Sequence, residues 1–137
     1  MKMKKILPDK NEAKTCKVVV TGDSGTGKIE LIKYFTKNEF KGNITTIGSP
    51  LFCRTMTFDE FGGESIKFKV FDTSGQERFQ SLSRSYFRNV DAVILVYDIT
   101  NRESFKNIIS WYRYIKEEAS EDISKKNIYY YFPFLFF

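Results

Sequence analysis

Hydrophobic and polar residues follow one another along this chain in patterns that predict its strands. Residues 66–70 read Ile-Lys-Phe-Lys-Val, and this alternation of apolar and basic side chains is typical of a strand with one buried face. Residues 92–97 form a continuous apolar run, as expected for a parallel strand covered on both faces. Residues 16–20 predict a first strand, and residues 51–58 and 66–71 flank a Gly62-Gly63 turn, which predicts a hairpin.

Two further segments have the apolar spacing of helices. The first, residues 28–38, places three apolar residues on one face: Leu31, Ile32 and Phe35. The run from Thr100 to Glu103 has the pattern of a capping box at the start of the second helix. We expect that helix to contribute five apolar residues to the core: Phe105, Ile108, Ile109, Tyr112 and Ile115. The order of elements predicts an α/β open sheet whose ligand lies at the carboxyl ends of its strands.

A glycine-rich run directly follows the first strand. Residues 22–28 read G-D-S-G-T-G-K, which matches the pattern of a phosphate-binding loop. Gly22, Gly25 and Gly27 allow the chain to turn tightly around phosphate oxygens, where a Cβ atom would clash. Lys28 supplies a positive charge at the start of a helix whose dipole also favours anions. Taken alone, the run has an alternative interpretation as an ordinary Gly/Ser/Thr-rich turn.

A second run makes the nucleotide interpretation more specific. The strand at residues 66–71 leads into D-T-S-G-Q-E-R-F at residues 72–79. Asp72, at the carboxyl end of a strand beside the first, is suited to hold Mg²⁺. Gly75 offers a backbone N–H to a γ-phosphate, and Gln76 can orient an attacking water because it both donates and accepts hydrogen bonds.

These runs resemble the motifs of Ras-like small GTPases, and most closely those of the Rab branch, which marks membrane compartments in vesicle traffic. The resemblance covers residues 15–120, and its matching stretches are residues 21–28, 45–48, 71–79, 85–89 and 94–100. It implies a P-loop NTPase fold, which is an open, mostly parallel sheet with one antiparallel hairpin strand, here truncated after the third helix. The implied ligands are GTP or GDP and Mg²⁺.

The resemblance also implies a role for individual residues. Thr46 and Asp72 would hold Mg²⁺, Gly75 would sense the γ-phosphate, and Gln76 would be the catalytic residue that positions the hydrolytic water. Phe40 would lie against the guanine edge. The loop and the residue after it would surround the phosphates: Gly22, Asp23, Ser24, Gly25, Thr26, Gly27, Lys28 and Ile29.

Three aromatic residues occupy positions that Rab proteins present to effectors and regulators. They are Phe52, Phe71 and Tyr86. Ordinary core packing is the alternative interpretation of each of them, and of Phe52 in particular.

Two departures from the family pattern concern the metal and the first switch region. Ile29 stands where the family has a Ser or Thr hydroxyl that ligates Mg²⁺, and an alkyl group cannot ligate this cation. The resemblance therefore implies weaker triphosphate binding and a bias toward the diphosphate or empty form. Pro50 removes a donor at the expected start of an edge strand. The stretch from Lys28 to Thr46 is one residue shorter than in Rab proteins.

The third departure concerns base recognition. The family reads guanine with Asn-Lys-x-Asp and Ser-Ala-Lys runs, and neither occurs in this sequence. Residues 127–137 instead read N-I-Y-Y-Y-F-P-F-L-F-F, residues with A/T-rich codons, which we interpret as the sign of a truncated or misread gene product. Residues 128–132 are candidates to fill the position of the fifth strand, with Pro133 ending the pairing.

We expect three segments: a basic N-terminal arm (1–14), a partial small GTPase domain (15–126) and an aromatic tail (127–137).

Composition limits the class of partner and compartment. Lys and Arg number 22 against 17 Asp and Glu, a net charge of +5, but no basic stretch with interleaved aromatics indicates nucleic acid binding. The N-terminus lacks the apolar run of a secretory signal, and the tail is about half the roughly 20 residues of a transmembrane helix. Cys16 and Cys53 are expected to be reduced, buried thiols in a cytoplasmic protein, and neither is a C-terminal prenylation site.

The sequence therefore predicts a GTPase that switches effector contacts in membrane traffic. The alternative is a pseudo-GTPase that acts as a non-catalytic interaction module, because Ile29 and the missing base-reading runs would weaken turnover. Whether the chain hydrolyses GTP stays open at this point. A kinase or ATPase that uses the same loop is not favoured, because residues 72–79 would have no role in such an enzyme.

Overall fold

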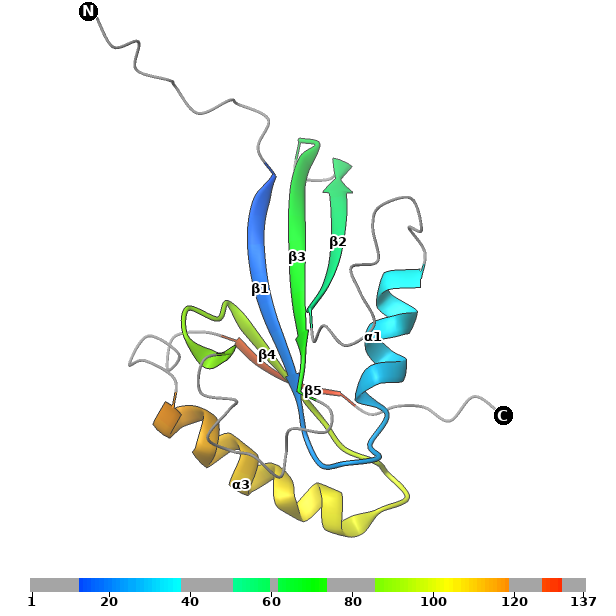
Figure 1. The fold of residues 1–137 in the computed structure, drawn as a ribbon, viewed down its shortest axis with the longest axis vertical. Helices are drawn as coiled ribbons and strands as arrows, with labels where there is room; N and C mark the ends of the chain where they lie inside the picture. Colours follow the sequence, from blue (N-terminus) through cyan, green and yellow to red (C-terminus); the bar gives the residue numbers. More distant parts are fainter. Residues whose placement is uncertain (1–12, 38–50, 60–61, 74–85, 119–126, 132–137) are drawn as a thin grey trace, which may run out of the picture.

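A computed structural model describes residues 13–37, 51–59, 62–73, 86–118 and 127–131 of the chain. These residues form one five-stranded sheet with the strand order β2-β3-β1-β4-β5, accompanied by two helices (Figure 1). The strands are β1 (Lys14–Thr21), β2 (Leu51–Phe58), β3 (Glu64–Asp72), β4 (Ala92–Val96) and β5 (Asn127–Tyr131). The helices are α1 (Lys28–Lys37) and α3 (Arg102–Glu118).

The pairing of the strands confirms the predicted fold class. β1 is parallel to β3 on one side and to β4 on the other, and β4 is parallel to β5. β2 and β3 form the antiparallel hairpin, in which Leu51 lies opposite Phe71 and Phe58 lies opposite Glu64. Because parallel neighbours need a crossover connection, the chain passes through α3 between β4 and β5. The carboxyl ends of β1, β3 and β4 consequently meet at one edge of the sheet.

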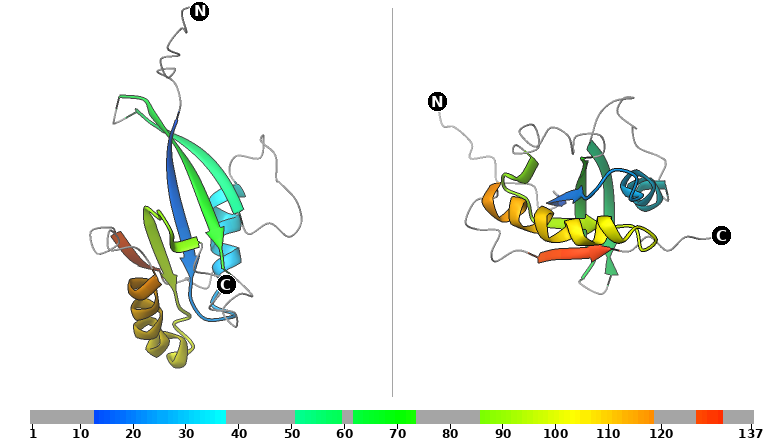
Figure 2. Two further views of the ribbon diagram at one scale, coloured as in Figure 1. Left: turned by 60° about the vertical axis from the view of Figure 1, so that its left-hand side comes forward. Right: turned by 90° about the horizontal axis from the view of Figure 1, so that it is seen from below.

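Each helix covers its own face of the sheet, as the two views of Figure 2 also show. On one face Ile32 of α1 packs with residues of three strands: Val18, Val20, Val70 and Val96. On the other face Ile108 and Ile115 of α3 pack with Phe87 and with side chains of β1 and β4: Val19, Val93 and Leu95. Successive residues of β1 therefore contribute to opposite cores, which explains why its apolar run is continuous.

The prediction of five core residues on α3 is wrong for two of them. Phe105 and Ile109 are 56% and 60% exposed, whereas Ile108 and Ile115 are buried. The buried stripe follows the spacing Ser104, Ile108, Trp111 and Ile115, of which Trp111 is half-buried. A single helix on an open sheet buries only one such stripe, so Phe105 and Ile109, each one residue past a buried position, lie beside it.

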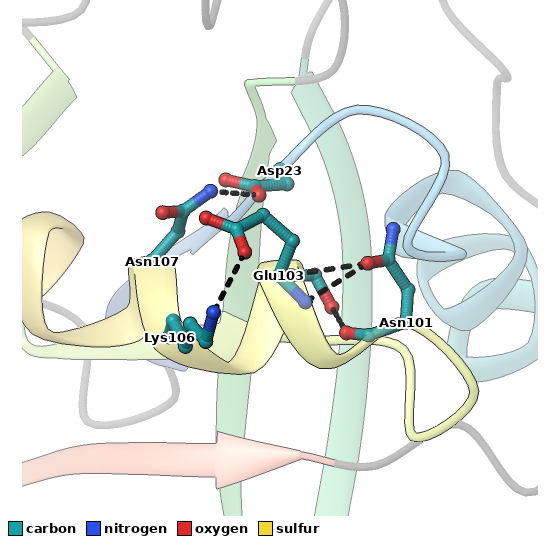
Figure 3. Close-up of polar contacts among 6 residues, drawn as sticks. Asp23, Asn101, Glu103, Lys106 and Asn107 are labelled. Carbon is teal, nitrogen blue, oxygen red and sulfur yellow. Dashed lines mark hydrogen bonds and ion pairs between the residues drawn. The ribbon is translucent and has the colours of Figure 1, made fainter.

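The start of α3 also differs from the predicted capping box. The helix begins at Arg102, and Asn101 is its N-cap: Asn101 Oδ1 accepts hydrogen bonds from the amides of Glu103 (3.0 Å) and Ser104 (3.4 Å) (Figure 3). Thr100 instead donates its amide and its hydroxyl to Asp98 Oδ1, at 2.8 and 2.7 Å. Asn is at least as good an N-cap as Thr, and here its side chain reaches two of the free amides of the first turn.

The two thiols do not share one environment. Both cysteines are free, as expected, but only Cys16 is partly buried, while Cys53 is exposed. Cys53 lies on the outward face of β2, whose side chains alternate between exposed and half-buried, so the expectation of two buried thiols is wrong for this residue. Within the described residues, neither helix combines the length and the apolar character required to cross a membrane.

Candidate phosphate-binding site

The loop between β1 and α1 is shaped by glycines that no other residue could replace without strain. Gly22, Gly25 and Gly27 have φ angles of +142°, +77° and +86°, a region that side chains rarely adopt. At Gly22 a Cβ atom would lie 2.1 Å from the carbonyl oxygen of Val96 in β4, which is far inside van der Waals contact. The loop therefore packs directly on the backbone of the neighbouring strand, and the sequence-based prediction of a tight glycine turn agrees with this geometry.

Lys28 closes the loop from its far end. It is the first residue of α1 and only 3% exposed, and its Nζ donates to the carbonyl oxygens of Gly22 (2.9 Å) and Asp23 (2.5 Å). Thr26 Oγ1 donates to the same Asp23 carbonyl (2.9 Å). These bonds hold the ammonium group against the inside of the loop, so a full positive charge is fixed beside the helix N-terminus.

The electrostatics of this end of the sheet favour an anion. The first turn of α1 leaves backbone N–H groups without intrahelical partners, and its dipole places partial positive charge at the same point as the Lys28 ammonium. Glycine-rich loops that lead into helix N-termini bind phosphates through this combination of amides, dipole and lysine. The described loop residues therefore fit a phosphate group.

The end of β3 brings one carboxylate to the loop. Asp72 is the last residue of β3 and lies in register with Val20, two residues before Gly22. The next residue, Thr73, is buried, and both its hydroxyl (2.9 Å) and its amide (3.3 Å) donate to the carbonyl oxygen of Val20. These bonds fix the carboxyl end of β3 against that of β1, a contribution of Thr73 that the sequence patterns did not indicate.

The same region fits Mg²⁺ less fully than it fits phosphate. Asp72 is buried and offers the oxygen ligand that this cation prefers. Ile29, half-buried in the first turn of α1, carries no oxygen at the position where the family pattern has a hydroxyl. In the described part of the chain, no three acidic, His or Cys side chains gather into a metal site.

Four of the residues singled out from the sequence lie outside the described residues. They are Phe40, Thr46, Gly75 and Gln76. Ser24, which is exposed, and Gly25 lie at the outer tip of the loop, while Thr26 is buried beneath it.

The proposed aromatic triad is split between the two faces of the sheet. Phe71 packs on the α3 face, where its ring centroid lies 5.6 Å from that of Tyr86. Phe52 lies opposite Val70 and packs on the α1 face with Val18 and Val20. The three aromatics thus do not form one surface, because neighbouring residues of a strand point to opposite faces. Leu51, the register partner of Phe71, is the β2 residue on the Phe71 face.

The side chain of Lys17 lies over the ring of Phe71. Lys17 Nζ lies 5.1 Å from the centre of the Phe71 ring and donates to the carbonyl oxygen of Arg88 at 2.6 Å. The amide of Lys17 donates to Asp91 Oδ2 at 2.8 Å. Burial lowers the pKa of Lys17, and the nearby negative charge of Asp91 partly opposes this shift. This arrangement fixes the segment before β4 against the sheet.

Contacts between the loop and α3 were not foreseen from the sequence. The side chain of Asp23 accepts hydrogen bonds from Asn107 and Trp111, both on α3. Their spacing of four residues on one helix is the only sequence signal that would have grouped them, and it does not by itself indicate a partner 84 or 88 residues away.

Comparison with known proteins gives one family. The model of the Ras family matches residues 17–128. Rab-8A of Bos taurus is 43% identical over 110 residues, which cover 80% of this chain and 52% of the relative, and Rab-8B of Bos taurus gives the same values. The Ras and EF-hand domain-containing protein of Danio rerio is 40% identical over 119 residues, 86% of this chain and 18% of that protein. The chain spans about half the length of the Rab-8 relatives.

Proposed function

The chain belongs to the Ras family, as a Ras-like small GTPase of the Rab branch, and from this premise we propose that it binds GTP and GDP, hydrolyses GTP slowly and switches effector contacts in vesicle-mediated membrane traffic. The observation that carries the proposal is the loop at residues 22–28. Its three left-handed glycines and its buried Lys28 form the cradle that the polyphosphate of a nucleotide requires.

The described residues have separate tasks in this proposal. The loop amides and Lys28 would bind the β- and γ-phosphates, and Asp72 would hold Mg²⁺ beside them. Bound Mg²⁺ supplies positive charge that offsets the charge of the phosphate oxygens. By family resemblance, Thr46 and Gly75 contact the γ-phosphate. Gln76 orients the attacking water, and Phe40 contacts guanine. Leu51, Phe71 and Tyr86 take the place of the expected triad as the apolar surface for effectors.

One observation favours a second candidate function, a pseudo-GTPase that serves as an interaction module. Ile29 occupies the first turn of α1, directly after Lys28, and its side chain has no oxygen to offer a cation. In this case the fold and the apolar surface of Leu51, Phe71 and Tyr86 persist, but the chain has weak or no nucleotide turnover.

Nucleotide titration tests both candidates. We would titrate purified protein with fluorescent GDP, GTP and ATP, each with and without Mg²⁺, and follow phosphate release in a single-turnover assay. Saturable binding with slow, Gln76-dependent hydrolysis supports the GTPase. Binding without phosphate release supports the pseudo-GTPase, and the absence of binding to all three nucleotides contradicts the proposal for the phosphate loop.

The choice of base is a prediction of its own. A site rejects a wrong ligand strongly when that ligand leaves buried polar groups unpaired, which reaches about 10⁴-fold or more. The sequence lacks the Asn-Lys-x-Asp acid that pairs with the guanine edge. We therefore expect GTP and ATP to compete within about an order of magnitude. A thousandfold preference for GTP would show that another residue reads the base.

A further inference from the structure

Asp23 connects the phosphate loop to a helix that follows it by some eighty residues. One carboxylate oxygen, Oδ2, accepts a hydrogen bond from Asn107 Nδ2 at 2.7 Å, and the other, Oδ1, accepts one from Trp111 Nε1 at 2.7 Å. Asn107 and Trp111 are four residues apart on α3, so both donors lie on one side of the helix. Figure 3 shows the Asn107 side chain directed at the Asp23 carboxylate.

The backbone of the same residue holds the loop together internally. The Asp23 carbonyl oxygen accepts hydrogen bonds from Lys28 Nζ and from Thr26 Oγ1. Rotation of the peptide group that carries this carbonyl would therefore break one of the contacts that hold the Lys28 ammonium. Asp23 is thus the point at which the internal bonds of the loop and its external bonds to α3 meet.

The donors on α3 are themselves held in place by packing. Ile108 and Ile115, on either side of Trp111 along the helix, are buried in the core with Phe87 and Leu95. The Trp111 ring packs edge-to-face against Tyr114, with 6.2 Å between the ring centroids. The indole N–H that bonds Asp23 is therefore held in place by packing within α3 and its core, separately from the bonds inside the loop.

Charge explains why this arrangement matters at an anion site. A carboxylate in a phosphate-binding loop would repel the phosphates if it turned inward, and it would compete for the Lys28 ammonium. Two neutral donors that face its two oxygens hold it outward, toward α3. Hydrogen bonds to a charged group are stronger than those between neutral groups, so two of them together favour the outward rotamer of this side chain.

We propose that Asn107 and Trp111 are positioning residues, which hold the Asp23 carboxylate outward and thereby keep the phosphate loop and Lys28 in the phosphate-accepting shape. Their effect on affinity rests on the proposed nucleotide binding, whereas their effect on the shape of the loop does not. It follows that the shape of the loop and the position of α3 depend on each other.

The test uses three variants and one control. Trp111→Phe removes the indole donor and keeps an aromatic ring, Asn107→Ala removes the amide donor, and Asp23→Asn leaves α3 intact while replacing one acceptor oxygen with a donor. Lys106→Ala is the control, because Lys106 is exposed on the same helix and its ammonium group pairs with Glu103 Oε2 at 3.2 Å. Melting curves for all four establish that each variant is folded.

Two readouts separate positioning from mere stabilisation of α3. The first is hydrogen exchange of the amides of residues 22–28 in the free protein, which we expect to accelerate at least tenfold in the three variants and to stay unchanged in Lys106→Ala. The second is the fluorescence of Trp111, the chain's sole tryptophan, whose emission we expect to shift in Asp23→Asn without any ligand. With fluorescent GDP, the dissociation constant should rise at least tenfold in the three variants.

The possible results are distinct. If wild type binds GDP and the variants bind within twofold of it, with unchanged loop exchange, the positioning role is overturned. If wild type binds no nucleotide but the loop exchange accelerates in the variants, the proposed function fails and the positioning role stands. If exchange and Trp111 emission are unchanged in folded Asp23→Asn, the positioning role fails whether or not GDP binds.

Discussion

The phosphate loop and the β5 edge lie on either side of β4 and are held to it in different ways. The loop rests on the Val96 carbonyl through Gly22 and is fixed by hydrogen bonds among residues 22–28. β5 is held by backbone pairing, from Ala92 opposite Asn127 to Val96 opposite Tyr131. The first arrangement depends on the identity of single residues, while the second is a ladder of backbone pairs between two parallel strands. Mutations should therefore act very differently in the two regions.

The largest effect is expected at Gly22. Gly22→Ala places a Cβ atom 2.1 Å from the Val96 carbonyl oxygen, so either the loop or β4 must move. We expect the free energy of unfolding to fall by about 4 kcal/mol or more, measured by urea denaturation. Gly25→Ala is the matched control, because its φ is also positive but nothing lies within 4 Å of its Cβ. It should cost about 1–2 kcal/mol. Equal losses would show that φ strain, and not contact with β4, fixes Gly22.

Removal of β5 should have the next largest effect. Deletion of residues 127–137 leaves the backbone groups along the outer side of β4 unpaired and turns β4 into an apolar edge. We expect a loss of about 3 kcal/mol, comparable with exposing one large apolar side chain, together with lower solubility. Deletion of residues 132–137 alone is the control, because it keeps the pairing of β4 with β5. A more soluble monomer with a cooperative melt after the longer deletion would contradict this role for β5.

Substitution of Ile29 tests whether Mg²⁺ binding depends on a side-chain oxygen at this position or only on the shape of the loop. Ile29→Thr adds a hydroxyl at the first turn of α1, and we expect Mg²⁺-dependent GTP binding to tighten about tenfold, or about 1.4 kcal/mol. Ile29→Val has nearly the same shape as the Thr variant without the oxygen, and it should bind GTP as wild type does. Equal affinity of the Thr and Val variants, measured by titration with and without Mg²⁺, would refute a metal-ligating role for this position.

The smallest effect is expected in the turn after β4. The hydroxyl and then the amide of Thr100 lower the pKa of Asp98, so ionised Asp98 stabilises the fold above its ordinary pKa near about 4. That stability is lost as the pH falls through the lowered pKa. The melting temperature of Thr100→Val should therefore lie slightly below that of wild type at pH 7 and approach it at pH 2–3. Thr57→Val, which breaks a hydroxyl contact to Ser65 with no acid involved, should show a pH-independent difference.

The same contrast explains what was predictable from sequence. The tight glycine turn at residues 22–28 and the position of Asp72 at the carboxyl end of β3 were predictable because both are encoded by neighbouring residues in a fixed spacing. The antiparallel hairpin and the mostly parallel sheet were found because alternation and continuous apolar runs report how many faces of a strand are buried. Both kinds of signal are local.

Several of the wrong predictions concern two adjacent residues, because periodicity alone does not show which of the two is buried or caps a helix. Phe105 and Ile109 fit a helical stripe, but Ser104 and Ile108 occupy the buried one. Phe52 and Leu51 are adjacent and both apolar, and only the register with Phe71 shows which of them shares its face. Asn101 and Thr100 are both good N-caps, and the helix start decides between them. The contacts of Asp23 with Asn107 and Trp111 depend on the docking of α3, which no local pattern encodes.

The unequal exposure of the two thiols has a practical consequence for experiments on this chain. The thiolate is the reactive form of cysteine, and burial, with a further contribution from Asp91, raises the pKa of Cys16. Cys53 stands exposed on β2, so a maleimide reagent at neutral pH should modify it first. A dye attached there, paired with Trp111 as the sole native fluorophore of its kind, would report the distance between the hairpin and α3 without any engineered mutation.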